Sequence, residues 1–159
     1  MSISAQDLEY LRRCVELAGS ALDDGDEPFG SLLVDATGRT RFEDRNRVAG
    51  GDATRHPEFA IARWAAEHLT PEERRAATVY TSGEHCPMCA AAHAWVGLGR
   101  IVYAASSAQL SRWCTEWGTP PAPVAPLPIG TVAPGIHTDG PADELTERMR
   151  ALYEAKFRP

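Results

Sequence analysis

The sequence contains almost no lysine and no concentrated positive charge. Lys156 is its only lysine, and the 159 residues carry a formal net charge of −6. The chain contains no extended run of Lys or Arg. The sequence therefore does not predict a basic patch that would bind nucleic acid or an anionic membrane. The composition therefore gives no support to a nucleic-acid groove or to a polybasic membrane anchor.

Long apolar runs are also missing, and cysteine is sparse. No stretch approaches the roughly 18 apolar residues of a membrane span, and MSISAQDLEY lacks the basic-then-apolar order of a signal peptide. Cys86 and Cys89 form one tight pair, whereas Cys14 and Cys114 stand alone. This spacing is unlike the disulfide framework of a small secreted protein. We expect a cytoplasmic protein with reduced thiols, of which Cys14 and Cys114 are inert.

What the chain does contain is enough apolar sequence for one core. Hydrophobic residues make up 43% of the 159 positions, which predicts a single domain over residues 1–159. Apolar residues recur at helical spacing between Ser4 and Gly25, and Ser4 with Asp7 resembles a capping box. The segments PFGSLLVDATGR and TRFEDRNRV then predict a strand hairpin.

Two further helices are predicted at segments that carry chemistry. In TRHPEFAIARWAAEHLT, Pro57 is tolerated only in a first helical turn, so His56 and Glu58 lie at a helix start. The segment after Cys86 is an alanine-rich helix between two buried strands, ATVYTS and RIVYAA. Strand, helix and strand in so short a space predict a right-handed parallel crossover.

The pattern weakens after Ser107. SAQLSRWCTEW predicts a short helix, and a proline-rich loop follows at about 118–135 because so much proline does not fit an interior element. Helical spacing returns at about 141–157 and predicts a C-terminal helix. The chain has no internal repeat.

The pair CPMC at residues 86–89 has three interpretations. At a helix start, the free N–H groups of the first turn favour thiolates, which suits a redox disulfide and a metal site equally. A closed structural zinc site needs four protein ligands, and the chain offers no second C-x-x-C and no H-x₃-H. A glutaredoxin-like redox disulfide is a second interpretation, because that motif also consists of a strand, the sequence C-P-x-C and a helix.

The third interpretation is a catalytic metal site that includes His56. Helix starts that follow neighbouring strands converge at one edge of an open α/β sheet, where ligands bind. His56, Cys86 and Cys89 would give zinc three ligands and leave a fourth position for water. Zinc lowers the pKa of such a water toward about 7, and Glu58 lies close enough in sequence to take its proton.

These residues carry a family resemblance. H-P-E at 56–58 with H-C-P-M-C at 85–89 resembles the H-x-E and P-C-x-x-C signature of zinc-dependent cytidine and nucleobase deaminases. The likeness extends over roughly residues 1–107 and is greatest to the bacterial guanine deaminase branch. It implies that His56, Cys86 and Cys89 are the ligands of one Zn²⁺ per chain and that Glu58 is the proton shuttle.

The resemblance also implies an architecture. The family fold is an α/β/α sandwich of three layers around a five-stranded mixed sheet, and its members are usually homodimers. Two positions depart from the family pattern: Pro57 replaces an alanine, and His85 replaces the proline before the first cysteine. His93, four residues after Cys89, is expected to be a hydrogen-bonded core histidine and not a ligand.

Four residues match substrate-binding positions of the family. Phe29, Asn46 and Trp95 correspond to base-contacting positions, and Glu116 lies near an acidic position that holds the N–H groups of the base. Each also has a plainer interpretation. Phe29 and Trp95 can be core residues, Asn46 a turn residue and Glu116 a surface carboxylate.

The expected function is hydrolytic deamination of a free aminated base such as guanine, cytosine or a related aminopyrimidine or triazine, with release of ammonia. The alternative within the family is a tRNA adenosine deaminase, which shares the H-x-E and P-C-x-x-C signature. An acidic chain is poorly suited to bind RNA, because RNA is a polyanion. The alternative outside the family is a redox or zinc-stabilised binding module built on C-x-x-C.

Overall fold

The fold is built around one five-stranded mixed sheet in the computed structural model, which describes residues 2–159. The strands are β1 (Gly30–Val34), β2 (Thr40–Arg45), β3 (Thr78–Gly83), β4 (Ile101–Ala105) and β5 (Thr138–Asp139). They lie in the order β2-β1-β3-β4-β5. β1 runs antiparallel to β2 and β3, whereas β4 runs parallel to β3 and β5. The predicted hairpin and the parallel crossover are both confirmed.

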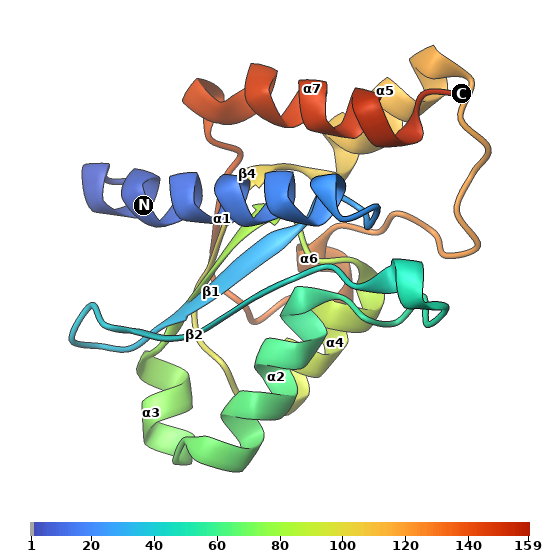
Figure 1. The fold of residues 1–159 in the computed structure, drawn as a ribbon. Coiled ribbons are helices and arrows are strands. Elements are labelled where there is room, and N and C mark those ends of the chain that lie inside the picture. The colour runs from blue at the N-terminus through green and yellow to red at the C-terminus, as the bar shows by residue number, and fades with distance from the viewer. Residues whose placement is uncertain (1) are drawn as a thin grey trace.

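Helices cover both faces of this sheet (Figure 1). The α-helices are α1 (Ala5–Asp23), α2 (Pro57–His68), α3 (Pro71–Ala76), α4 (Pro87–Trp95), α5 (Ser107–Trp117), α6 (Ile129–Val132) and α7 (Thr146–Phe157). α1, α5 and α7 form one layer, and α2, α3, α4 and α6 lie on the other side of the sheet. This arrangement is the expected three-layer α/β/α sandwich. Among the helices of residues 2–159, none is long and apolar enough to cross a membrane.

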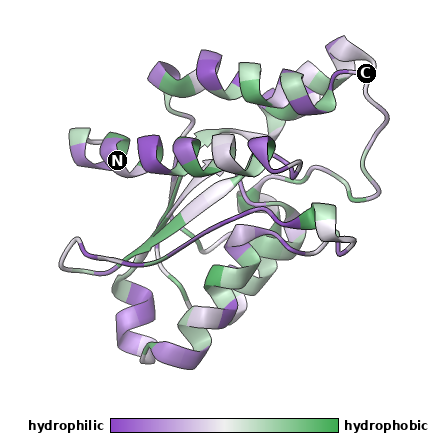
Figure 2. Cartoon of the chain, in the orientation of Figure 1, coloured by the Kyte–Doolittle hydropathy of each residue, from purple (hydrophilic) through white to green (hydrophobic). Residues whose placement is uncertain are grey.

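The first helix forms where capping chemistry and apolar spacing agree. The Ser4 hydroxyl accepts from the Asp7 N–H at 3.1 Å, and the Asp7 carboxylate accepts from the Ser4 N–H at 2.8 Å, so the capping box is confirmed. Hydrophobic and hydrophilic residues alternate along α1 (Figure 2), and its apolar face is buried against the sheet. The helix ends before Gly25, whose φ of 87° favours glycine.

The two faces of β3 point to different layers because side chains alternate along a strand. Tyr80 belongs to the core cluster shared with α1 and α7, whereas Val79 belongs to the cluster shared with α2. β1 is buried along its whole length, as expected for a strand paired on both sides. Thr81 has the same parity as Val79, so it faces the α2 layer, where it contacts Glu58.

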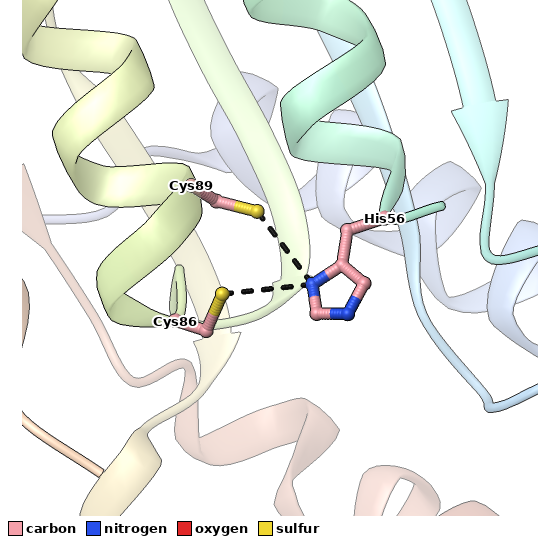
Figure 3. A group of neighbouring side chains, drawn as sticks. All are labelled: His56, Cys86 and Cys89. Carbon is pink, nitrogen blue, oxygen red and sulfur yellow. Dashed lines mark hydrogen bonds between the residues drawn. The ribbon is translucent and has the colours of Figure 1, made fainter. Parts of the chain in front are cut away.

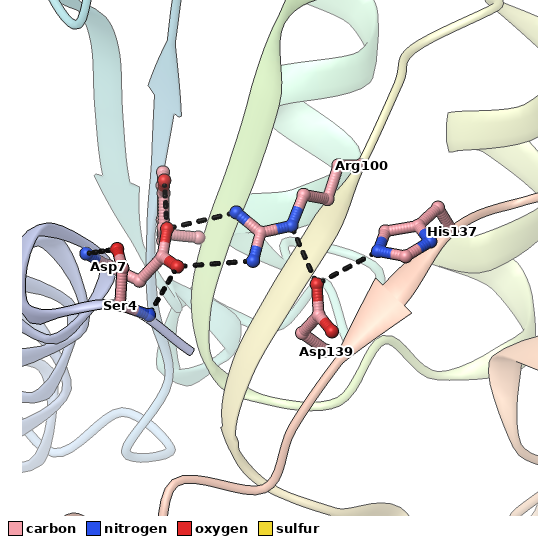
Figure 4. A network of polar contacts seen from close by, with 6 residues as sticks. Ser4, Asp7, Arg100, His137 and Asp139 are labelled. Carbon is pink, nitrogen blue, oxygen red and sulfur yellow. Dashed lines mark hydrogen bonds and ion pairs between the residues drawn. The ribbon is translucent and has the colours of Figure 1, made fainter. Parts of the chain in front are cut away.

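A buried charge network ties the start of β4 to α1 and β5 (Figure 4). The Arg100 guanidinium donates to both oxygens of Asp7, at 2.9 and 3.1 Å, and to Asp139 at 2.7 Å. Tyr80 donates to Asp7 at 2.7 Å, and His137 lies 3.0 Å from Asp139. Because Arg100 precedes β4, this network lies at the opposite end of the sheet from the C-terminal end of β3.

The later part of the chain differs from the expectation in two places. The proline-rich segment contains the short helix α6, whose first residue, Ile129, is 1% exposed and belongs to the core. The Glu84 carboxylate accepts the Ile129 N–H at 2.9 Å and the Ser107 N–H at 2.8 Å, which fixes this segment to α5. The C-terminal helix begins at Thr146 rather than near 141, because the chain still forms β5 at Thr138–Asp139 and then a 3₁₀ turn at Asp143–Leu145.

Candidate active site and metal centre

Two helix starts bring the signature residues together. His56 is the N-cap of α2 and Cys86 is the N-cap of α4, and each is followed by a proline at the first helical position. Proline suits this position because its φ is already helical and its missing N–H has no partner there. α2 and α4 pack against each other, so their first turns lie side by side.

His56, Cys86 and Cys89 form a compact group of possible metal ligands (Figure 3). Nδ1 of His56 lies 3.5 Å from Sγ of Cys86 and 3.6 Å from Sγ of Cys89, and all three atoms lie within 4.8 Å of one another. One imidazole and two thiolates are ligands that zinc prefers. Within the part of the chain that the structure describes, this group has three members, as an open catalytic site requires, and not the four of a closed structural site.

The electrostatics of the group also fit a cation. Hydrogen bonds from Cys89 and His56 lower the pKa of Cys86 to about 4, although burial opposes this. The thiolate at Cys86 in turn raises the pKa of Cys89 and, by its hydrogen bond, raises the pKa of His56 to about 9. A divalent cation stabilises both thiolates and accepts the imidazole in place of a proton, so the donor set suits Zn²⁺.

Glu58 lies beside this group without joining it. Its carboxylate is 5% exposed, with Oε2 3.9 Å from Sγ of Cys89 and Oε1 3.0 Å from the Thr81 hydroxyl. Burial raises the pKa of Glu58 against the opposing positive charge of His56. The Ser31 hydroxyl lies 2.9 Å from that of Thr81, so a chain of two buried hydroxyls ends at the carboxylate. A buried acid at this place can accept and return a proton.

Asn46 and Phe29 lie next to each other near the end of β3. Oδ1 of Asn46 accepts the N–H groups of Glu27 at 3.2 Å and Val48 at 3.1 Å, which fixes the amide orientation. Nδ2 of Asn46 is buried and has no hydrogen-bond partner in residues 2–159. The Phe29 carbonyl accepts the Asn46 N–H at 2.9 Å, and the Phe29 ring borders Gly83. The Phe29 ring and an amide donor of Asn46 without a partner among residues 2–159 thus lie near the end of β3.

Comparisons with known proteins identify the family. The model of the cytidine and deoxycytidylate deaminase zinc-binding region matches residues 4–105, which include the three candidate ligands and Glu58. The chain belongs to this family. Membership supports a zinc-binding deaminase, a hydrolytic enzyme that acts on a C–N bond.

The relatives differ in the substrates that their names state. A probable cytosine deaminase of Schizosaccharomyces pombe is 33% identical over 119 residues, or 75% of this chain and 72% of that protein. A guanine deaminase of Bacillus subtilis is 35% identical over 98 residues, or 60% of this chain and 62% of that protein. A tRNA-specific adenosine deaminase of Agrobacterium fabrum is 33% identical over 102 residues, or 64% of this chain and 66% of that protein. The chain thus spans under two thirds of the last two relatives.

A solved structure supports the fold over the full chain. The guanine deaminase from Nitrosomonas europaea aligns with a TM-score of 0.69 and covers 98% of this chain and 86% of its own. Its sequence identity is 22%, so this likeness shows the fold alone. The expected cytidine deaminase-like sandwich is confirmed.

The structure does not bring Trp95 and Glu116 into the site. Trp95 ends α4, whereas Cys86 begins it, and the indole is 89% exposed, so it is neither a core residue nor a lining residue in this chain. Glu116 lies on α5, in the other helix layer, and pairs with Arg150 of α7 at 3.3 Å with 47% of its side chain exposed. The surface interpretation of Glu116 fits this position, because the carboxylate has a local cation and solvent.

His85 and His93 pack against each other beneath the site. Their rings meet edge to face at 5.4 Å, and Nε2 of His93 lies 2.7 Å from the Gly99 carbonyl oxygen, so the prediction of a hydrogen-bonded core histidine is confirmed. Burial lowers the pKa of both, that of His93 to about 4. His85 therefore fills the core as a neutral ring, and Cys86 keeps its place at the start of α4.

Sequence reasoning missed Thr81 and Ser31. Both lie in buried strands, where hydroxyl side chains are common enough to give no signal of their own. Their importance follows only from the pairing of β1 with β3, which places Ser31 opposite Thr81.

Proposed function

We propose that this protein hydrolyses the exocyclic amino group of a free heterocyclic base, such as guanine, cytosine or a related aminopyrimidine or triazine. The observation that carries the proposal is the position of Glu58. Its carboxylate is buried 3.9 Å from Sγ of Cys89, yet it stays outside the His56, Cys86 and Cys89 group. A redox pair needs neither this acid nor the histidine, whereas deamination needs both.

The residues divide the chemistry between them. His56, Cys86 and Cys89 would hold the zinc ion, which, when bound, acts as a Lewis acid that lowers the pKa of a water molecule. Glu58 takes a proton from that water and delivers it to the ring nitrogen of the base. The water oxygen adds to the carbon that bears the amino group. Glu58 then takes the remaining proton from the added hydroxyl group and passes it to the amino nitrogen, and the C–N bond breaks to give ammonia and a ring carbonyl.

Thr81 orients Glu58 during these transfers. Its hydroxyl lies 3.0 Å from Oε1 of Glu58 and 3.0 Å from the Gly83 carbonyl, and the Ser31 hydroxyl donates to it at 2.9 Å. These contacts hold one carboxylate oxygen, which leaves Oε2 directed toward the Cys89 side of the site. The carboxylate can thus move a proton without changing its rotamer.

Asn46 and Phe29, which the sequence analysis matched to base-contacting positions, have side chains that can recognise a planar base. The amide of Asn46 is held by two backbone N–H groups, and its Nδ2 is a donor without a partner among the described residues. A carbonyl or ring nitrogen of a base is a matching acceptor. The ring of Phe29 supplies an apolar edge beside it. The names of two relatives, a cytosine deaminase and a guanine deaminase, support a free base.

A substrate panel tests the proposal. Zinc-loaded protein is incubated with guanine, cytosine, the nucleosides guanosine and cytidine, and tRNA, and ammonia release is measured. We expect release from at least one free base. Activity on tRNA alone would favour the tRNA adenosine deaminase that one relative's name suggests. Oxidation of dithiols without ammonia release, retained in His56→Ala, would favour the redox module.

We also propose that the protein forms a homodimer, as the family resemblance implies. The 89% exposed indole of Trp95 offers a contact to a second chain, because tryptophan is enriched at protein–protein interfaces. Sedimentation velocity of the wild type should give twice the mass of one chain. A monomer across micromolar concentrations would contradict this.

A further inference from the structure

Two residues separate the end of β3 from the first cysteine of the candidate metal centre. β3 ends at Gly83, and Cys86 is the N-cap of α4. Glu84 and His85 thus form the whole link between the sheet and this helix. His56, by contrast, enters the site from the start of α2 (Figure 3). The 3.5 Å between Nδ1 of His56 and Sγ of Cys86 therefore depends on where the link places the start of α4.

Glu84 is held at three points. Its backbone N–H donates to the Ala105 carbonyl at 2.8 Å, where the pairing of β3 with β4 ends. Its carboxylate accepts the Ser107 N–H at 2.8 Å through Oε2 and the Ile129 N–H at 2.9 Å through Oε1. Ser107 and Ile129 are the first residues of α5 and α6. Hydrogen bonds to a charged acceptor are stronger than neutral ones, so both the backbone and the side chain of Glu84 are fixed.

His85, the other residue of the link, is held by ring packing. Its side chain is 1% exposed and meets the ring of His93, within α4, edge to face at 5.4 Å. Nε2 of His93 in turn lies 2.7 Å from the Gly99 carbonyl oxygen, just before β4. The start of α4 is therefore fixed by polar contacts at position 84 and by packing at position 85.

We infer that Glu84 is a positioning residue of the metal centre, which sets the place of Cys86 relative to His56. The inference rests on the metal centre of the proposed function. Each carboxylate oxygen of Glu84 already accepts a backbone N–H, so the residue acts on the site through the chain and not by direct contact. The two residues from Glu84 to Cys86 span at most about 7 Å, so a shift of Glu84 is carried to the thiolate.

One consequence concerns the part of the chain beyond the family match. The family model matches residues 4–105, whereas Ser107 and Ile129, the two donors to Glu84, follow that part. Ile129 also ends the exposed stretch of the proline-rich segment, residues 120–128, and comes 45 residues after Glu84. The proline-rich segment is thus anchored two residues away from a metal ligand. Its anchor contributes to the geometry of the metal centre.

The first test is Glu84→Gln, with Glu73→Gln as the matched control. Glutamine keeps the length of the side chain but has one acceptor oxygen, so one of the two N–H groups loses its partner. Glu73 also accepts a backbone N–H at a helix start, that of Thr70 at 2.8 Å, but it is exposed on α3. The zinc dissociation constant is measured by competition with a chromophoric chelator. The absorption spectrum of the cobalt-substituted protein and the melting temperature of the metal-free protein are recorded for each variant.

We expect Glu84→Gln to raise the zinc dissociation constant about tenfold, the lower end of the loss seen when a metal site loses an outer supporting contact. The cobalt absorption bands should shift, because the thiolate of Cys86 no longer stands at the same place relative to His56. Glu73→Gln should leave both quantities unchanged. A residue that only supports the fold would lower the melting temperature of the metal-free protein and nothing else. A zinc dissociation constant within about twofold of the wild type, well short of the expected loss, with an unchanged cobalt spectrum would therefore overturn the inference.

Ser107→Pro breaks the same contact without altering Glu84, and it decides the question if Glu84→Gln does not fold. Proline is favoured at the first position of a helix, and the N-cap Ser106 already has φ −84° and ψ 157°, as the residue before a proline requires. Ala5→Pro, at the first position of α1, is the control. We expect Ser107→Pro to raise the zinc dissociation constant about three- to tenfold, the effect of one lost hydrogen bond. A value equal to that of Ala5→Pro would contradict the role of Glu84.

The outcomes separate this inference from the proposed function. If the wild type binds zinc but releases no ammonia from any base, the proposed function fails, and the zinc dissociation constants still decide the role of Glu84. If the wild type releases ammonia and Glu84→Gln binds zinc as the wild type does, the inference fails and the proposed function stands. A wild type that binds no zinc overturns both.

Discussion

The Thr81 hydroxyl lies 3.0 Å from Oε1 of Glu58, although the two residues come from different layers of the sandwich. Thr81 is a strand residue and Glu58 belongs to the first turn of α2. The contact links the central sheet to Glu58, the residue that we propose moves protons. It also leaves the other carboxylate oxygen free to face the metal ligands.

We predict that Thr81→Val lowers kcat by about 10- to 100-fold, because Glu58 loses the hydrogen bond that orients it. The Ser31 hydroxyl also loses its acceptor, which should cost about 1 to 3 kcal/mol of unfolding free energy. Thr81→Ser keeps the hydroxyl and is the control. Steady-state kinetics and denaturant unfolding measure both effects. A kcat that stays near the wild-type value in Thr81→Val would remove the hydroxyl from the mechanism, and a loss in Thr81→Ser alone would assign the effect to the methyl group.

Glu58→Gln separates catalysis from metal binding. The amide keeps the shape of the side chain but cannot accept and return a proton, so turnover should fall by about 10⁴ or more. Zinc content should stay at one per chain, because Glu58 lies outside the ligand group. Ammonia release and elemental analysis on one preparation check both points. Near-normal turnover would remove Glu58 from the mechanism, and loss of zinc would make it a ligand.

Removal of zinc should destabilise the protein, because the ion holds the first turns of α2 and α4 together and binds the folded state preferentially. At a free zinc concentration about 100 times the dissociation constant, the stabilisation is about 2.7 kcal/mol. Melting curves with and without a chelator measure it. Cys89→Ser should abolish the zinc-dependent shift, whereas Cys114→Ser, a change at a half-buried cysteine outside the ligand group, should retain it. A shift that persists in Cys89→Ser would contradict the assigned site.

The network around Arg100 predicts how stability responds to acid. Burial alone would raise the pKa of Asp7, but hydrogen bonds from Arg100, Ser4 and Tyr80 outweigh it and lower this pKa well below its ordinary value. A carboxyl with a depressed folded-state pKa stabilises the protein above its unfolded pKa of about 3.9. That contribution is lost as the pH falls from about 4 through the folded-state pKa.

Asp7→Asn should therefore lower the unfolding free energy by about 2 to 4 kcal/mol at pH 7, because it leaves the partly buried Arg100 charge with less compensation. The difference from the wild type should narrow as the pH falls below about 4. Denaturant unfolding at several pH values measures this. Glu72→Gln, which removes an exposed partner of Arg75, is the control and should leave stability unchanged. A gap that is independent of pH would refute the assignment of the acid effect to Asp7.

Short sequence motifs by themselves determined where several helices begin and which residues form the candidate metal site. The capping box at Ser4 and Asp7, and the prolines that follow His56 and Cys86, act within one helical turn, so the letters themselves predict where helices begin. Because the ligands stand at these helix starts, the candidate metal centre could be read without coordinates. The family signature added Glu58 for the same reason, since it is fixed relative to His56 by the same turn.

Only the tertiary structure decided which distant residues meet the site. The sequence suggested that Trp95 and Glu116 bind the substrate. In the structure, Trp95 lies at the exposed end of α4, and Glu116 lies on α5 in an ion pair. Thr81 and Ser31 approach Glu58 through the pairing of β1 with β3, which joins segments far apart in the chain. Such contacts depend on how whole layers pack, and no short window of sequence contains that information. The candidate metal ligands could therefore be predicted from short stretches of sequence, whereas the contact of Thr81 with Glu58 depends on the tertiary structure.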